Sequence, residues 1–300
     1  MSLRTPTTRT RVGALGAAVA LALSLTACGD DSSSGDSTDV TVEDNPDFPA
    51  DSTMAALADE GKITIGVKID QPGIGNLEPG ADAPEGLDIE MGRIIAAGLG
   101  ISDDNIDWKE TISDNREAFI KGGDVDLVIA SYSITDDRRE IVGQAGPYYV
   151  TGQQILVREE DKDKITGPDD LSGIKTCSVE GSTSLATAQD EYGADPIPLA
   201  TYSECVDQLK NNTVDAVTTD GAILLGYEAE SPDELQVVGE PFSEERYGIG
   251  YKKGDTEFCE FLQDTIKDAQ DDGTWAKAFE NTLGQSGVDT PDPPEMDPCQ

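Results

Sequence analysis

The chain of 300 residues contains no histidine. Without an imidazole it cannot form a Ser-His-Asp or Cys-His nucleophile pair, and it cannot offer histidine to zinc. Basic residues are also few: 21 Lys and Arg stand against 60 Asp and Glu, for a formal net charge of -39. This balance argues against nucleic acid as a partner, because affinity for phosphates comes from Lys and Arg. The length suits one large domain or two ordinary ones.

The N-terminal residues look like an export signal. Three arginines precede an apolar stretch at residues 12–27, which is too short and too rich in small residues for a spanning helix. Residues 25–28 read Leu-Thr-Ala-Cys, similar to the lipobox of bacterial lipoproteins. We therefore expect a signal peptide at 1–27, lipid attachment at Cys28, and a protein anchored on the extracytoplasmic face of the cell membrane. An ordinary secretory signal with an incidental cysteine is the alternative.

Residues 28–50 are rich in Ser, Asp and Gly, which predicts a disordered tether between the anchor and the body. After Cys28, four cysteines remain, and an even number in an exported protein suggests two disulfides with three possible pairings. We favour Cys177–Cys205 and Cys259–Cys299, because each pair lies within one region of the chain. Closing loops of this size is worth about 3–4 kcal/mol in the chain-entropy description. A redox-active pair is disfavoured because the sequence has no CxxC spacing.

The body alternates strand and helix patterns. Short β-branched runs predict strands at 63–67, from 106 onward, and at 125–130, 154–157, 174–179, 214–219 and 235–238. Helical spacing of apolar residues predicts helices at 88–99, 115–121, 184–189, 205–210, 258–269 and 274–283. This alternation predicts a largely parallel α/β architecture, and its restart near residue 174 suggests two lobes. Because residues 123–130 resemble 212–219, the polar segments that follow them (131–138, and 220 onward) should face one site.

Several short motifs occur in a consistent order between about Lys62 and Leu283. They are Gly86-Leu87-Asp88-Ile89-Glu90; Gly123 with Val125 and Asp126; Ser133-Ile134-Thr135-Asp136-Asp137-Arg138; Gly181-Ser182-Thr183-Ser184; Val214-Asp215-Ala216 with Asp220; and Gly273-Thr274-Trp275. Together they resemble the family 3 solute-binding proteins of bacterial ABC importers, which capture polar amino acids. Residues 66–73 look most similar to the glutamate- and glutamine-binding lipoproteins of Gram-positive bacteria.

The resemblance implies an α/β, two-lobed fold of the periplasmic-binding-protein type (type II) with two crossover hinge segments. Lobe 1 would comprise 51–147 and 248–300, lobe 2 would comprise 153–242, and the hinges would lie near 148–152 and 243–247. A ligand would bind between the lobes and favour the closed form, which an ABC permease in the cytoplasmic membrane would recognise. We expect a monomer that uses no cofactor, binds no metal or nucleic acid, and is not an enzyme.

The chemistry of an α-amino acid indicates which residues would hold it. A planar guanidinium binds a carboxylate through two parallel hydrogen bonds, and Arg138 is the candidate. Asp220 would pair with the ligand ammonium, and Asp70 would share that role. Residues Gly181, Ser182 and Thr183 lie before a predicted helix, whose N-terminal N–H groups suit a carboxylate.

Further contacts are predicted around this centre. Ser131 and Ser133 would offer hydroxyl and backbone groups, and Gln71 would line the cleft. Lys68 shares one face of an extended strand with Asp70 and would meet a side-chain carboxylate of the ligand. For all of these residues a purely structural role as strand-end hydroxyl, helix cap, turn or solvated charge is the alternative. Arg116 is assigned mainly a structural role.

Glutamate is the favoured ligand, followed by glutamine, aspartate and asparagine. The net charge does not decide this, since charges beyond about 8 Å are screened at physiological salt. Ser113 falls where some members of the family place a stacking aromatic, which points to a ligand with a polar or acidic side chain. Two other functions stay open: an amino-acid sensor lipoprotein that signals through a membrane partner, and a dehydratase-like enzyme on the same fold.

Overall fold

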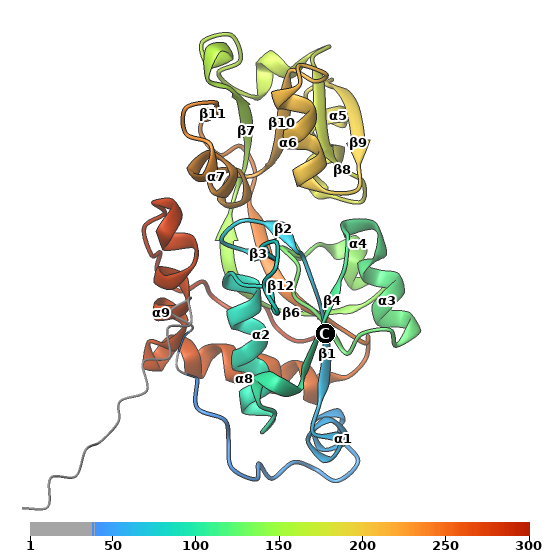
Figure 1. Ribbon diagram of the computed structural model, residues 1–300. Coiled ribbons are helices and arrows are strands. Elements are labelled where there is room, and N and C mark those ends of the chain that lie inside the picture. Colours follow the sequence, from blue (N-terminus) through green and yellow to red (C-terminus); the bar gives the residue numbers. More distant parts are fainter. Residues whose placement is uncertain (1–37, 39) are drawn as a thin grey trace, which may run out of the picture. The chain divides into compact units, whose positions relative to one another are not determined.

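The computed structural model describes residues 38 and 40–300, so the predicted signal peptide (1–27) and the predicted lipid-attachment residue Cys28 lie outside the described residues. Two five-stranded sheets organise the described part of the chain (Figure 1). Each sheet is mixed, with helices packed against it. Among the described residues, no helix has the length and apolar character that crossing a membrane requires.

The first sheet has the strand order β4-β1-β5-β12-β6. Its strands are β1 (Ile63–Val67), β4 (Ile106–Glu110), β5 (Leu127–Val128), β6 (Gly143–Thr151) and β12 (Glu245–Tyr251). Strand β1 is parallel to β4 and β5, whereas β12 is antiparallel to β5 and β6. Its helices are α1 (Thr53–Glu60), α2 (Leu87–Gly98), α3 (Arg116–Gly122), α4 (Asp136–Arg139), α8 (Thr256–Asp272) and α9 (Thr274–Asn281). A small hairpin of β2 (Asp70–Gln71) and β3 (Gly75–Asn76) follows β1.

The second sheet has the order β11-β7-β10-β8-β9. Its strands are β7 (Gln153–Arg158), β8 (Lys175–Val179), β9 (Asp195–Leu199), β10 (Ala216–Asp220) and β11 (Leu235–Val238). Strand β8 is parallel to β9 and β10, and β7 is antiparallel to β10 and β11. Its helices are α5 (Thr183–Asp190), α6 (Tyr202–Lys210) and α7 (Gly221–Glu230). Short 3₁₀ turns lie at Asp103–Asn105, Ser113–Asn115, Glu159–Asp161, Pro168–Leu171 and Leu283–Ser286.

The predicted α/β fold is confirmed, but the prediction of largely parallel sheets is wrong because β7 and β12 run antiparallel to their neighbours. The regular part of β5 is also shorter than the predicted strand at 125–130. Helices α1, α4 and α7 and strands β6, β9 and β12 were not predicted. Helix α7 has no polar stripe because most of it is buried, and β9 contains two prolines, which an edge strand tolerates.

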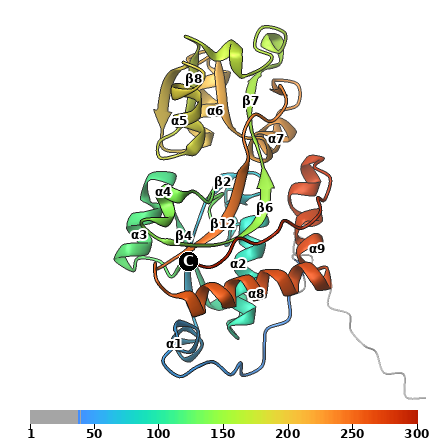
Figure 2. The same ribbon diagram turned by 180° about the vertical axis from the view of Figure 1, so that it is seen from behind.

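The two sheets are connected by strands that pair with each other. Strand β6 runs through Gly152 into β7, and β12 returns antiparallel beside β6, with Glu245 opposite Thr151 and Tyr247 opposite Tyr149. Figure 2 shows β6 leading from the first sheet into β7 of the second, with β12 beside it. The predicted hinge segments, 148–152 and 243–247, fall on or beside this paired region. The lobe boundaries themselves stay a prediction.

Both predicted disulfide pairings are present: Cys177–Cys205 joins β8 to α6, and Cys259–Cys299 joins α8 to the C-terminal segment. Within that segment Asp297 makes several contacts. Its carboxylate pairs with Arg139 at 2.9 Å and also with Arg246, and its N–H donates to the carbonyl of Gly146. The C-terminal segment therefore lies against α4, β6 and β12 of the first sheet.

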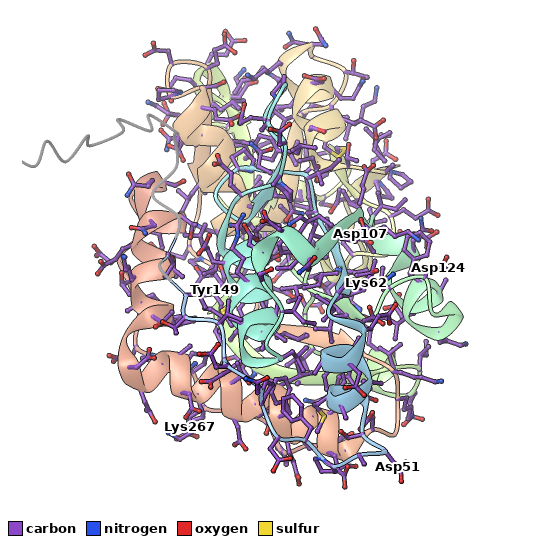
Figure 3. All side chains as sticks on the ribbon, turned by 60° about the horizontal axis from the view of Figure 1, so that its bottom comes forward. Asp51, Lys62, Asp107, Asp124, Tyr149 and Lys267 are labelled. Carbon is purple, nitrogen blue, oxygen red and sulfur yellow. A yellow bond between two sulfur atoms is a disulfide. The ribbon has the colours of Figure 1, made fainter. Side chains whose placement is uncertain are left out.

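The predicted tether is too long at its C-terminal end. The N–H of Glu43 donates to the carbonyl of Ala97 in α2, and the ring of Phe48 packs edge-on against Phe261 in α8. Residues 28–37 and 39 of the predicted tether lie outside the described residues. Charged side chains such as Asp51, Lys62 and Lys267 lie on the outside of the structure, whereas Tyr149 is buried (Figure 3).

Candidate ligand-binding site

A polar cavity lies where the carboxyl ends of strands from both sheets meet. The open space inside it is small, about 10 Å³, roughly enough for one water molecule. Only Ile223 among its lining residues has a fully apolar side chain. The first sheet contributes Ser113, Arg116, Ser131, Ser133 and Arg138, and the second contributes Ser182, Thr183, Ser184, Tyr202, Thr219, Asp220 and Ile223. As predicted, the segments after residues 123–130 and 212–219 face the same cavity.

Ser131, which lies shortly after β5, has an uncommon backbone conformation. Its φ is +42°, a region that non-glycine residues seldom occupy. The N–H of Ser131 donates to the buried carboxylate of Asp88 at 2.6 Å, and that carboxylate also accepts from the hydroxyl of Tyr148 at 2.5 Å. Burial raises the pKa of Asp88 to about 6. Asp88, at the start of α2, therefore fixes the backbone of Ser131 in the cavity wall.

Two arginines form the positive side of the cavity. The guanidiniums of Arg116 and Arg138 lie 4.4 Å and 5.1 Å from the ring centre of Tyr132. Arg138 donates to the carbonyl of Ser133 at 2.7 Å, and its Nε lies 3.6 Å from a carboxylate oxygen of Glu117. Burial, followed by repulsion from Arg138, lowers the pKa of Arg116 to about 10, so it stays charged at neutral pH.

The same two arginines reach across to the second sheet. Arg138 and Arg116 donate to the carbonyl of Gly181 at 3.0 Å and 3.3 Å. Gly181 has φ +76°, and a Cβ there would lie 3.0 Å from the Cα of Asp114, so this close approach requires glycine. A carbonyl oxygen carries only a partial negative charge. Two convergent guanidiniums are therefore suited to a full carboxylate.

Asp220 forms the negative side of the cavity. Its carboxylate accepts from the hydroxyl of Tyr247 at 2.7 Å and from that of Ser184 at 3.4 Å. Burial, followed by the nearby charge of Glu245, raises the pKa of Asp220 to about 7. A cation brought against Asp220 would favour its charged form. The cavity thus offers complementary partners for the two charges of an amino acid.

Lys68 is buried beside the cavity rather than in its wall. Its ammonium donates to the hydroxyl of Ser113, a lining residue, at 2.9 Å. Burial, followed by repulsion from Arg116, lowers the pKa of Lys68 to about 7. An anionic group close to Lys68 would therefore bind more strongly where the lysine is protonated.

The structure places the other predicted residues in different surroundings. Ser182 lines the cavity and also caps α5, because its hydroxyl accepts from the N–H of Leu185 at 3.0 Å. Thr183 lines the cavity and donates to Glu245 at 3.0 Å. Gln71 is fully buried outside the cavity wall, and its amide has no hydrogen-bond partner among the described residues.

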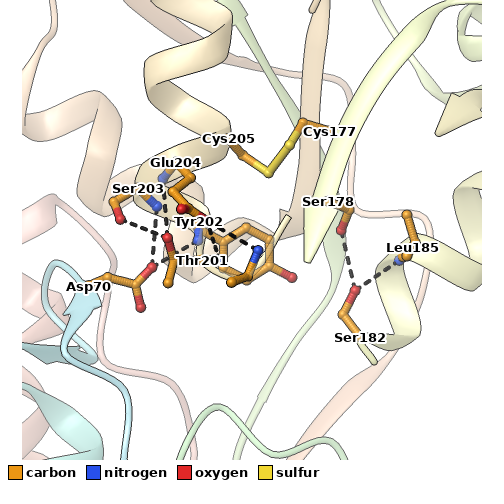
Figure 4. The surroundings of a disulfide bond; sticks show 11 residues. Asp70, Cys177, Ser178, Ser182, Leu185, Thr201, Tyr202, Ser203, Glu204 and Cys205 are labelled. Carbon is orange, nitrogen blue, oxygen red and sulfur yellow. Dashed lines mark hydrogen bonds between the residues drawn. A yellow bond between two sulfur atoms is a disulfide. The ribbon is translucent and has the colours of Figure 1, made fainter. Parts of the chain in front are cut away.

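Asp70 also lies outside the cavity wall. Its carboxylate accepts from the N–H groups of Tyr202 and Ser203 at the start of α6 (Figure 4). The structure therefore does not bring Asp70 together with Asp220, as the shared ammonium-binding role requires. Arg116, for which the sequence predicts a mainly structural role, also lines the cavity. Its position at the start of a short helix carried no signal for this, because the contact depends on how α3 meets the loop at Gly181.

Ser184, Tyr202, Thr219 and Ile223 also line the cavity and were not predicted to do so. Thr219 and Ile223 flank Asp220 in the sequence, which is the signal that was available for them. Tyr202 was missed because the helix at 202–210 was predicted to begin at 205.

Two α/β sheets connected by paired strands, with a charged cavity between them, define a class of two-part binding proteins that enclose a small polar solute. Residues 63–285 match the bacterial extracellular solute-binding proteins, family 3, and the chain belongs to this family.

Three known binding proteins are similar to this chain over most of its length. The glutamate-binding protein GluB of Corynebacterium glutamicum is 37% identical over 293 residues, covering 94% of this chain and 93% of GluB. The ABC transporter glutamine-binding protein GlnH of Bacillus subtilis is 31% identical over 261 residues, covering 86% of this chain and 92% of GlnH. The structure of an ancestral arginine-binding protein bound to arginine aligns with a TM-score of 0.68 and 31% identity, covering 74% of this chain and 98% of that one. All three are binding proteins, in agreement with the prediction that this chain is not an enzyme.

Proposed function

We propose that this protein captures a polar amino acid outside the cytoplasmic membrane and delivers it to an ABC importer, with glutamate favoured over glutamine, aspartate and asparagine. The observation that carries the proposal is the convergence of Arg116 and Arg138 on one carbonyl oxygen, with Asp220 in the wall of the same cavity. The names of GluB and GlnH support an acidic or amide amino acid as the ligand.

In the proposed complex, Arg138 and Arg116 hold the α-carboxylate in place of the Gly181 carbonyl. Asp220 pairs with the α-ammonium, and hydroxyls such as those of Ser131 and Ser133 complete the hydrogen bonds. Lys68, through its place beside Ser113, supplies the charge that favours a side-chain carboxylate over an amide. A ligand with a cationic side chain would bring a further positive charge to a cavity that already contains two guanidiniums, which disfavours arginine and lysine.

The proposed cycle is closure and release. The two sheets with their helices move as lobes about residues 148–152 and 243–247, and the ligand shifts the population toward the closed form. A membrane permease recognises that form. The lipid on Cys28 keeps the protein at the extracytoplasmic face of the membrane.

Thermal unfolding with a panel of amino acids tests the ligand assignment. The purified protein is first unfolded and refolded to remove bound solute, and each amino acid is then added at about 1 mM. A ligand with micromolar affinity adds about 4 kcal/mol to the free energy of unfolding. Stabilisation confined to glutamate and its near relatives supports the proposal. Stabilisation by arginine or lysine would show that the ligand is a basic amino acid and would refute the preference for glutamate. If no amino acid stabilises the protein, amino-acid capture is refuted.

The anchor and the transport role need separate tests. Cells that express the chain and are fed a labelled fatty acid should label the wild-type protein and not the Cys28→Ser variant. Uptake of labelled glutamate should fall when the gene is deleted. Normal uptake together with a lost transcriptional response to glutamate would instead favour the sensor function.

A further inference from the structure

Residues 70–72 join the two sheets at a place outside the cavity. They follow β1 of the first sheet, yet the carboxylate of Asp70 accepts from the N–H groups of Tyr202 at 2.8 Å and Ser203 at 3.2 Å, the first two residues of α6 in the second sheet (Figure 4). The contact therefore runs from one sheet to a helix of the other.

The start of α6 is well suited to receive this carboxylate. The first N–H groups of a helix have no partner within it, and the helix dipole places partial positive charge there. Thr201 caps the N–H of Glu204, and Glu204 in turn accepts from the N–H of Thr201. The Asp70 carboxylate accepts from the two N–H groups that this capping box leaves without a partner, those of Tyr202 and Ser203. Because Cys205 of α6 is bonded to Cys177 of β8, Asp70 holds an element that is covalently fixed to the second sheet.

A second contact lies beside the first. The hydroxyl of Tyr227 in α7 donates to the carbonyl of Asp70. Gly226 packs directly against Pro72, since a Cβ at Gly226 would lie 2.3 Å from the carbonyl oxygen of Pro72. Gly226 lies inside a helix, where glycine is an unfavourable residue. The close approach of Pro72 gives a physical reason for its presence there.

We propose that residues 70–72 form a closure latch. The latch binds the start of α6 and the side of α7, and it holds the two sheets together without touching the ligand. This inference rests on the proposed closure of the lobes around a ligand. It assigns Asp70 a positioning role in place of the predicted contact with the ligand ammonium. The latch sets the population of the closed form, and the cavity residues set which ligand is bound.

The two roles of Asp70 predict different results. A contact that stabilises the closed form equally for all ligands changes every dissociation constant by the same factor. A contact with the ligand changes the constants by factors that depend on the ligand. The ratio of the constants for glutamate and glutamine therefore separates a latch from a binding residue.

The first test uses Asp70→Ala in the full protein, with Kd measured by titration calorimetry for L-glutamate and L-glutamine. Loss of a helix-capping carboxylate is expected to raise both constants about tenfold. The ratio between them should stay within about twofold of wild type, because the latch lies outside the cavity wall. Asp126→Ala is the matched control, since the Asp126 carboxylate accepts the N–H of Thr64 at 2.8 Å within the first sheet. An unchanged Kd, or a ratio that shifts with the ligand, would overturn the latch.

The second test uses Gly226→Ala, which adds a methyl group against Pro72. Alanine improves the helix propensity of α7, so weaker binding by this variant cannot come from a weaker helix. The expected result is a rise in Kd for both ligands with no fall in the unfolding temperature of the ligand-free protein. Binding as tight as wild type would show that α7 does not need to approach Pro72, and would overturn the latch.

A third measurement separates the latch from the proposed function. If the refolded wild-type protein binds no amino acid, the proposed function fails, and small-angle X-ray scattering of the ligand-free protein then tests the latch alone. Asp70→Ala and Gly226→Ala should each increase the radius of gyration relative to wild type and to Asp126→Ala. Equal radii in all four proteins would overturn the latch.

Discussion

Replacing Arg138 by alanine should remove most of the affinity for the ligand. The side chain is only 11% exposed, and its guanidinium donates to the carbonyls of Ser133 and Gly181. In the proposed complex its bond to the Gly181 carbonyl gives way to two bonds to the α-carboxylate. A hydrogen bond to a charged group contributes about 1.5–3 kcal/mol, so two of them contribute about 3–6 kcal/mol. Because Arg116 remains in the cavity, we expect the lower end, which is a rise in Kd of at least about 100-fold.

Two further variants make this measurement specific. Arg138→Lys keeps the charge and loses the planar pair of donors, so its Kd should lie between those of the wild type and Arg138→Ala. Arg93→Ala is the control: its side chain is 15% exposed and pairs with Glu90 and Asp103, away from the cavity. Calorimetric titration of glutamate into each protein gives the constants. A Kd for Arg138→Ala within about threefold of wild type would refute the proposed carboxylate site.

Three further outcomes are expected. Lys68→Met should weaken glutamate binding more than glutamine binding, by about tenfold in the ratio of the two Kd values; an unchanged ratio would remove Lys68 from the specificity mechanism. Because burial raises the pKa of Asp220 to about 7, the folded protein binds more protons than the unfolded chain between about pH 4 and 7, so the free energy of unfolding of the ligand-free protein should fall as the pH rises through that window. Asp220→Asn should reduce this slope, which chemical denaturation at several pH values would detect. Replacing Cys259 and Cys299 by serine opens a loop with a sequence separation of 40, and should lower the free energy of unfolding by about 4 kcal/mol in the chain-entropy description; a loss below about 1 kcal/mol would contradict it.

Much of the architecture was readable from local patterns. The run at residues 63–67 is a buried central strand, and its β-branched composition is sufficient to predict it. Strand β12 is not predicted, although Tyr247, Ile249 and Tyr251 alternate, because the glycines between them weaken the strand pattern. Its strand character comes from pairing with β6, which lies far away in the sequence. A contact of that kind has no local signature.

The residues of the site also fall into two groups, those that local patterns predict and those that depend on distant contacts. Arg138, Ser133 and Asp220 follow strands that resemble each other, so their common location could be inferred from the position of strand ends. The positions of Asp70 and Arg116 could not, since each depends on how the two sheets approach. The capping of α6 by Asp70 is an encounter between residues more than 130 positions apart. Sequence spacing along β1 carries no information about it.

The C-terminal segment gives the site a support that the family match does not include. The match ends at residue 285, whereas Asp297 pairs with Arg139 and Arg246. Arg139 is the neighbour of Arg138, and Arg246 is the neighbour of Tyr247, which donates to Asp220. One carboxylate thus holds a sequence neighbour of Arg138, on the positive side of the cavity, and a sequence neighbour of Tyr247, which contacts the negative side. Two relatives with identical cavity walls can therefore differ in how firmly those walls are braced, and a comparison confined to the shared family region would not reveal the difference.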